Sequence, residues 1–275
     1  MKKIISLSLT FLLIFISSIS AFASNSYDYK LESEVSELNF SIVNNHSTLR
    51  LFNLTEEITH VELYNNYAVI TSSDSIISNF DLGNNLHFEK MSNLPTEENV
   101  ILIKNQENQL QGVVGIPRIT LSTGEVIYGN NTVSGNRIIS EIPDDVTSDV
   151  ESISLYVYVQ RDFYYYFSDG NYEERYYDEL GGIGGNFYLN PIAHTFQSDR
   201  ARQLEVLAMS WEAVDRRFRG FSGSDYTNWV NNFDSLYNQY RCHYSFASLA
   251  SECNLEHWRP NANYAVIVAH GCNYY

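Results

Sequence analysis

The hydrophobic period of this chain changes partway along its length. Between residues 24 and 142, short runs rich in β-branched and aromatic residues alternate with polar turns, and no helical period extends through them. Beyond residue 198, apolar residues recur instead at spacings of three and four. Because side chains repeat every second residue along a strand and about every 3.6 residues along a helix, the two parts require different structures. The chain is therefore predicted to be α+β, with the strands first.

Pairs of apolar runs around polar turns predict hairpins in the front part. One turn is Asn65-Asn66, and asparagine tolerates the positive φ that a tight hairpin turn needs. The pairs are the two halves of Thr59–Ser72, Val100–Lys104 with Leu110–Val114, and Arg118–Leu121 with Val126–Tyr128. Hairpins at this spacing indicate an antiparallel, sandwich-like or barrel-like domain over residues 24–142.

An acidic segment follows these strands. Pro143–Glu151 reads PDDVTSDVE, and its proline and clustered acids predict a linker at 143–151. A calcium loop is the functional alternative, but the oxygen ligands lack EF-hand spacing and the required glycine. We therefore predict a linker and no metal site, with an α+β domain over residues 152–275.

The back part is predicted to combine strands and helices. Ser152–Val159 alternates and predicts a strand, and Ala262–Ala269 is interpreted as a last strand. One amphipathic helix is expected between Ser198 and Gly220, and a second from Ser224 to Tyr240. The glycines at 181–185 match neither the dinucleotide nor the P-loop fingerprint. They predict a loop, and no cofactor is expected.

The first 23 residues have the organisation of a secretory signal peptide. Lys2 and Lys3 precede an apolar stretch that runs from Ile4 to Ile19 and is interrupted only by Ser and Thr. Ala21-Phe22-Ala23 then forms a small-x-small cleavage site. The apolar run is shorter than the roughly 20 residues of a transmembrane helix. We expect export, a mature chain that starts near Ser24, an extracellular location and no transmembrane segment in the mature chain.

The negative charge is concentrated in the front part. Residues 24–194 carry 25 acidic and 8 basic side chains, whereas residues 195–275 carry 8 and 7. Nucleic acid requires a basic footprint, and anionic membranes attract basic segments, so the acidic part argues against both partners. A cell-surface or cell-wall target remains open as the partner.

Aromatic side chains crowd the segment from residue 163 to residue 188. Tyrosine offers a flat apolar face and a polar tip, which suits the binding of sugars or proteins. Tyr164, Tyr166 and, further along, Trp258 are therefore candidate binding residues. The alternative is structural, because aromatic residues also suit strands and half-buried surfaces.

The C-terminal part also gathers residue types that can perform chemistry. His243, Glu256, His257, Arg259 and His270 lie within 28 residues of one another. Such a set could supply a general acid and base or bind zinc, or it could simply pack around a disulfide. Cys242, Cys253 and Cys272 predict one disulfide and one remaining thiol in an exported chain, and three pairings are open. Cys253 with one of the histidines is a further catalytic alternative.

The tail of the chain carries a recognisable signature. It reads QYRCH at 239–243, NLEHWRP at 254–260, Tyr264, and GCN at 271–273. This resembles the C-terminal pattern Q-aromatic-x-C-H, W-N-L-E-x-W-R-P, Y and C-N of an exported bacterial family, domain of unknown function 2599. The resemblance implies a Cys242–Cys272 disulfide and leaves Cys253, where the family tends to have tryptophan, as the odd thiol. It implies no activity.

A second resemblance concerns the front part. Gly112-x-x-x-x-Pro117, Gly124 and Gly135 are similar in spacing to the N-terminal halves of some exported bacteriocin precursors of Gram-positive bacteria. In those proteins an acidic front half is removed and the C-terminal piece acts on other cells. We therefore expect a secreted bacterial protein that binds or acts as an effector without catalysis, in one version a precursor of an antibacterial C-terminal domain. The alternative is a secreted hydrolase that uses the His/Glu set.

Overall fold

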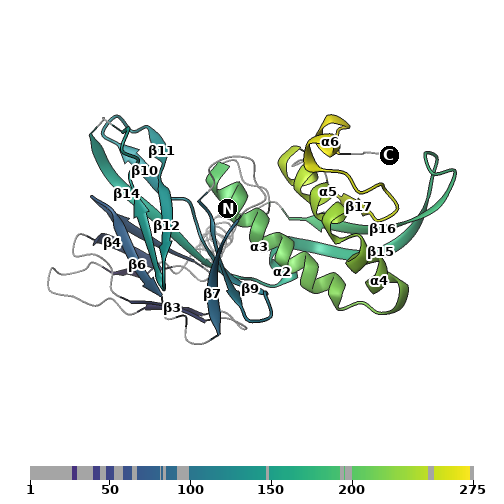
Figure 1. Ribbon diagram of the computed structural model, residues 1–275, viewed down its shortest axis with the longest axis horizontal. Coiled ribbons are helices and arrows are strands. Elements are labelled where there is room, and N and C mark those ends of the chain that lie inside the picture. The colour runs from purple at the N-terminus through teal and green to yellow at the C-terminus, as the bar shows by residue number, and fades with distance from the viewer. Residues whose placement is uncertain are drawn as a thin grey trace, which may run out of the picture.

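The computed structural model describes residues 27–29, 40–43, 48–52, 58–63, 67–80, 82, 85–91, 99–146, 149–192, 195, 200–246 and 251–272. The expected signal peptide, the Asn65-Asn66 turn and the Ser198 cap lie outside these residues. Within them, β-sheets occupy one end of the molecule, and helices with a smaller sheet occupy the other (Figure 1). The predicted α+β class, with antiparallel sheets in the N-terminal part, is confirmed.

The larger sheet has nine strands and is antiparallel. Its path is β1-β4-β5-β14-β9-β8-β7, and β10 pairs with both β14 and β11. These strands are β1 (Tyr27–Tyr29), β4 (Ile58–Leu63), β5 (Tyr67–Ser72), β7 (Leu86–Lys90), β8 (Ile101–Asn105), β9 (Leu110–Val114), β10 (Arg118–Leu121), β11 (Val126–Tyr128) and β14 (Val150–Val159). The three predicted strand pairs, β4 with β5, β8 with β9 and β10 with β11, are all present.

A second antiparallel sheet packs against the first. Its order is β12-β13-β6-β3-β2. The strands are β2 (Phe40–Val43), β3 (Thr48–Phe52), β6 (Ile76–Phe80), β12 (Asn130–Ser134) and β13 (Arg137–Glu141). Side chains from both sheets, among them Ile76, Ile138 and Leu155, are fully buried in one core. Each such buried aliphatic side chain contributes about 1.5–3 kcal/mol.

The strand that follows the acidic segment lies inside the larger sheet. Val150–Val159 pairs antiparallel with β5 and with β9, and β10 pairs along its first half. Its alternation, which predicted a strand, places Ile153, Leu155 and Val157 in the core between the sheets. The proposed division of the chain at 143–151 stays a prediction, but β14 itself is joined to strands that precede the acidic segment.

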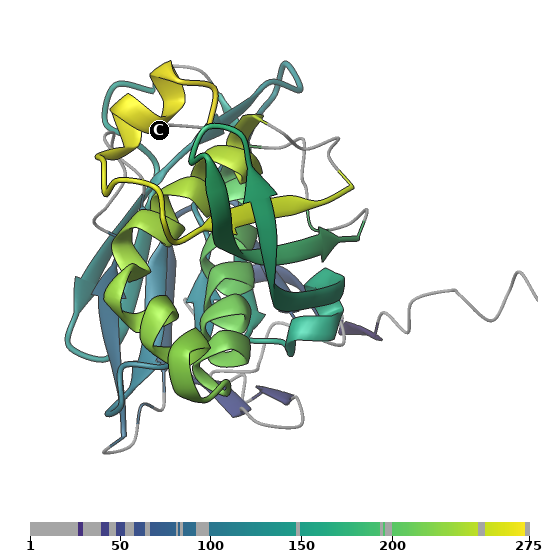
Figure 2. The same cartoon turned by 90° about the vertical axis from the view of Figure 1, so that its right-hand side faces the viewer.

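The remaining elements form a three-stranded sheet with helices on one side of it (Figure 2). The strands are β15 (Phe167–Tyr177), β16 (Gly182–Pro191) and β17 (Cys253–Glu256), and the helices are α2 (Phe163–Tyr166), α3 (Arg200–Arg219), α4 (Gly223–Asn231), α5 (Phe233–Phe246) and α6 (Tyr264–Ala269). Phe187 and Leu255 of the sheet share a core with Phe218, Trp229 and Leu236 of the helices. Among the described residues, no helix has the length and apolar character needed to cross a membrane.

Three local predictions were wrong. The predicted second helix is interrupted at Asn232, so that α4 and α5 are separate. Residues 264–269 form a helix rather than a strand, because the Asn263 side chain accepts a 3.0 Å hydrogen bond from the Val266 N–H and caps it. Gly182 to Gly185 belong to β16 and not to a loop. Glycine is required at Gly184 because a side chain at this position would collide with the Trp258 ring.

The helices are anchored to the larger sheet by a buried carboxylate. Glu205 of α3 is fully buried and accepts hydrogen bonds from the Ile116 N–H at 3.2 Å and from Arg118 at 3.1 Å. The surrounding core cluster contains residues from both parts, including Val113 of β9 and Leu207 of α3. The α3 helix is therefore held against the sheet by apolar contacts and by a buried ion pair.

Candidate functional site

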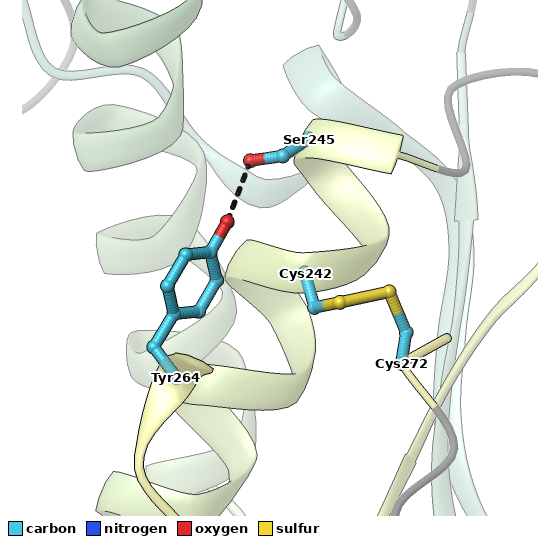
Figure 3. Close-up of a disulfide and its surroundings, with 4 residues drawn as sticks. All are labelled: Cys242, Ser245, Tyr264 and Cys272. Atoms are coloured by element: carbon cyan, nitrogen blue, oxygen red, sulfur yellow. Dashed lines mark hydrogen bonds between the residues drawn. A yellow bond between two sulfur atoms is a disulfide. The ribbon is translucent and has the colours of Figure 1, made fainter. Parts of the chain in front are cut away.

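The disulfide implied by the family resemblance is present. Cys242 in α5 is bonded to Cys272, which follows α6, with a Cα–Cα distance of 5.5 Å (Figure 3). The Tyr264 hydroxyl donates to Ser245 at 3.3 Å, and the Arg241 guanidinium lies 3.9 Å from the Tyr264 ring centre. Together these contacts attach α6 to α5.

The third cysteine is buried and not disulfide-bonded. Burial raises the pKa of the Cys253 thiol to about 12. A nucleophilic cysteine must be a thiolate near neutral pH and accessible to its substrate. The surroundings of Cys253 therefore suit a packing role in the core with Leu255 and Phe187.

The chain around β17 distributes the signature residues over two faces of the small sheet. Leu255 and His257 lie towards the helices, where both are near Phe187. Glu256 and Trp258 lie on the opposite face, where Trp258 packs at 4.9 Å from the Tyr177 ring. This alternation follows from strand geometry, in which neighbouring side chains point to opposite faces. Glu256 and His257 are therefore not brought together.

A polar network covers the face of the small sheet that points away from the helices. The Asn254 side-chain oxygen accepts from Asn186 at 2.6 Å and from Arg175 at 3.2 Å. Arg175 also pairs with Glu252 at 3.0 Å, and Glu256 pairs with Arg259. Each of these carboxylates faces a guanidinium, and the ion pairs fix the side chains on this face of the sheet.

The candidate histidines occupy three different environments. Burial lowers the pKa of His243, which is hydrogen-bonded to the backbone of Asn254. Burial also lowers the pKa of His257, whose Nε2 lies 3.3 Å from the Tyr172 hydroxyl. His270 is exposed at the C-terminal end of α6. No group of three or more metal-binding side chains occurs among the described residues.

The candidate aromatic residues differ in exposure. Tyr164 is 63% exposed, whereas Tyr166 is 1% exposed and packs against Phe167. Trp258 is half-buried, and the Arg259 guanidinium lies 4.7 Å from its ring centre. Of the three aromatic candidates, Tyr164 has the most surface available to a ligand.

The structure also contains a cleft that the sequence does not reveal. It has a volume of about 750 Å³ and lies between β7, β8 and the β8–β9 turn on one side and α3 and α5 on the other. Its helix side is aromatic. Trp211 is 9% exposed, and its ring centre lies 5.3 Å from that of Phe233 and 5.1 Å from that of Tyr237. Met91 and Leu102 contribute the apolar surface of the strand side.

Charged side chains surround this aromatic wall. Three ion pairs, each with an N–O distance of 2.8 Å, line the cleft: Lys104–Glu89, Arg216–Glu212 and Arg219–Asp215. Burial raises the pKa of Glu212, and the neighbouring Arg216 opposes this shift. Among the described residues, two further carboxylates of the cleft, Glu107 and Asp234, form no ion pair.

Comparisons with known proteins extend this description only for the C-terminal part. The family described as "Protein of unknown function (DUF2599)" matches residues 196–274, which include α3 to α6 and the disulfide. The resemblance recognised from the signature is thus confirmed for this segment. Neither the curated proteins nor the solved structures yield a significant match. The comparisons therefore identify a family for the C-terminal part and assign it no activity.

Proposed function

We propose that this chain is a secreted bacterial binding protein without catalytic chemistry, and that its ligand occupies the cleft between the larger sheet and α3 and α5. The cleft carries the proposal. Its volume of about 750 Å³ falls within the usual range of ligand sites. The cleft also has an aromatic wall, which includes Trp211, and a rim of fixed polar groups. These features suit a site that binds its ligand without converting it.

The ion pairs of the cleft support binding more than catalysis. A general acid or base must exchange a proton with the reacting group. Asp215 accepts from both Arg219 and the Trp229 indole N–H, each at 2.8 Å, so its oxygens are committed to protein donors. These fixed groups shape the wall of the cleft, and they are not free to exchange a proton with a bound molecule.

A hydrolase is the second candidate function. The four side chains first considered for it, His243, Glu256, His257 and His270, lie in separate environments, which does not favour a shared site. The observation that favours hydrolysis is Glu212, because a carboxyl group whose pKa is raised by burial resembles a general acid. If the protein degrades a cell-wall polymer and Glu212→Gln abolishes this activity, the hydrolase replaces the binding protein.

Binding is tested with cell-wall and whole-cell fractions of bacteria. The immobilised protein is compared with Ala208→Trp, in which a large ring fills part of the cleft next to Trp211. Asn171→Trp, which adds the same ring to an exposed position on β15, is the matched control. We expect capture by the native protein and the control and little capture by the filled variant. Equal capture by all three proteins would remove the cleft from the proposal.

Export and processing form a separate part of the proposal. A disulfide is typical of exported proteins, and the Cys242–Cys272 bond supports this location. Intact-mass measurement on protein from spent medium should give a chain that starts near Ser24 and gains about two hydrogens on reduction. A dominant C-terminal fragment would instead favour the precursor of an antibacterial domain, and killing assays against neighbouring bacteria would follow.

A further inference from the structure

The polar groups of the cleft carry more negative than positive charge. Five carboxylates line it, from Glu89, Glu107, Glu212, Asp215 and Asp234, against three cationic side chains. Each of the cations is already paired with one of these carboxylates. The excess therefore resides on Glu107 and Asp234.

These two carboxylates lie on opposite sides of the cleft. Glu107 belongs to the turn between β8 and β9, and Asp234 lies in the first turn of α5. Glu107 is exposed, so its charge is available to a ligand at the rim. A ligand with two positive charges joined by an apolar spacer offers one charge to each acid and an apolar chain to Leu102 and Trp211, which line the same cleft.

The aromatic wall also suits a cation. The face of an aromatic ring attracts positive charge, with an energy that grows as water is excluded. The Arg219 guanidinium already lies 5.3 Å from the Phe233 ring centre, at the edge of the cleft. Tyr237 and Trp211 continue the same wall and provide further ring surface.

The charge of the whole chain acts in the same direction. The formal net charge is −16, and residues 24–194, which include the strand side of the cleft, have 25 acidic and only 8 basic side chains. A field of this sign raises the local concentration of cations and repels anions. Acidic ligands are therefore disfavoured both in the cleft and on approach to it.

We infer that the cleft binds alkylammonium groups, with at least two ammonium centres joined by an aliphatic chain. This inference rests on the proposed function, in which the cleft is the binding site. The same chemistry is offered by the lysine side chains of a basic peptide and by a free polyamine. In either case Glu107 and Asp234 hold the ammonium groups and the aromatic wall holds the chain between them.

Calorimetric titration of the full mature protein tests this inference. The probes are spermidine, a hexalysine peptide, a neutral chitooligosaccharide and a hexaglutamate peptide. We expect the two cationic probes to bind and the hexaglutamate not to bind, with weaker affinity at 0.2 M than at 0.05 M salt because exposed charges are screened. Binding by spermidine and hexalysine identifies the shared ammonium chemistry, and binding by hexalysine alone identifies the peptide.

A pair of double variants separates a specific site from the general field. Glu107→Gln/Asp234→Asn should weaken the binding of the cationic probe about tenfold. Glu125→Gln/Asp144→Asn removes the same charge from exposed positions outside the cleft and should leave affinity within about twofold. Circular dichroism confirms that each variant is folded. Equal weakening by both variants would overturn the inference, because the field alone would then explain binding.

The remaining outcomes distinguish the inference from the proposed function. If only the chitooligosaccharide binds, and Ala208→Trp abolishes this binding, the cleft is a ligand site for a neutral glycan and the alkylammonium inference fails alone. If no probe binds, the alkylammonium inference fails, and capture of cell-wall fractions decides the proposed function independently.

Discussion

Gln239 shows how one side chain can replace a neighbouring strand. Its amide oxygen accepts from the Glu256 N–H at 2.8 Å, and its amide nitrogen donates to the Glu256 carbonyl at 3.1 Å. A side-chain amide has the donor and acceptor of a peptide group, so Gln239 completes the pairing of β17 on the side away from β16. This contact gives the glutamine at the start of the QYRCH signature a structural role.

Replacement of Gln239 by alanine should destabilise the protein by about 2–4 kcal/mol, because a buried N–H and a buried carbonyl lose their partners. The free energy of unfolding is measured by urea denaturation. Asn261→Ala, which removes an exposed amide, is the control and should change stability by less than about 0.5 kcal/mol. Equal midpoints for the two variants would show that Gln239 does not support β17.

Cys253 should be unreactive in the folded protein. Its thiol is buried and its pKa is raised to about 12, so little thiolate forms at pH 8. A thiol reagent such as DTNB should modify no cysteine under native conditions, one per chain in denaturant, and three in denaturant after reduction and removal of the reductant. Rapid modification of the native protein would contradict the buried position.

At the scale of elements, α6 is the segment whose secondary structure the sequence pattern did not predict correctly. Residues 262–269 are apolar and rich in β-branched side chains, and a run this short fits a strand or a buried helix equally well. The Asn263 cap and the disulfide at Cys272 select the helix. The cap is visible in the sequence, whereas the disulfide became assignable only through the family resemblance. The hairpins were predicted because their pairing is local.

The cleft could not be predicted in the same way. Its strand side comes from residues 89–110 and its helix side from residues 208–237, and no spacing rule connects the two segments. Trp211, Phe233 and Tyr237 fit the helical stripes that predicted core faces, and Trp211 is in fact nearly buried. Only the tertiary arrangement reveals that one edge of this aromatic layer is open to the cleft.

The disulfide should stabilise the unit formed by α5 and α6. The bridge joins residues 30 positions apart, for which the chain-entropy treatment gives about 3–4 kcal/mol. Cys242→Ser/Cys272→Ser is expected to lose roughly this free energy in urea denaturation. Hydrogen exchange should locate the largest loss of protection in α6, because the disulfide is the covalent link between Cys272, just beyond this short helix, and α5. Unchanged protection in α6 would contradict this assignment.

Across the whole molecule, two partly buried histidines should make stability depend on pH. Burial places the pKa values of His243 and His257 below their ordinary value of 6.5, so the folded protein binds protons less readily than the unfolded chain. Stability is therefore complete above about pH 6.5 and is lost as the pH falls through the lowered pKa values. Urea denaturation between pH 8 and pH 5 measures the loss of stability, which should be smaller in His257→Gln than in the native protein.

The interface between the larger sheet and α3, here called the joint, is formed around Glu205 and Arg118. It decides whether the molecule unfolds as one unit. Glu205 is fully buried and paired with Arg118, and the core around it contains residues of both β9 and α3. Removal of one member of a buried ion pair leaves the other charge without compensation, at a cost of about 3–5 kcal/mol. Glu205→Leu should therefore weaken the joint strongly, whereas Glu205→Leu/Arg118→Met should recover much of the loss, because both charges are absent.

Two probes of unfolding separate the parts. All three tryptophans, Trp211, Trp229 and Trp258, lie in the helical and small-sheet part, so their fluorescence reports on that part, whereas circular dichroism also reports on the larger sheets. We expect coincident transitions in the native protein and separate transitions in Glu205→Leu.

Since β14 is bound on both sides within the larger sheet, a cut in the acidic segment would leave this strand attached to the front part even after cleavage. Release of a C-terminal domain would then require the joint at Glu205 and the pairing of β14 both to open, so coincident transitions would favour a protein that acts as a single piece.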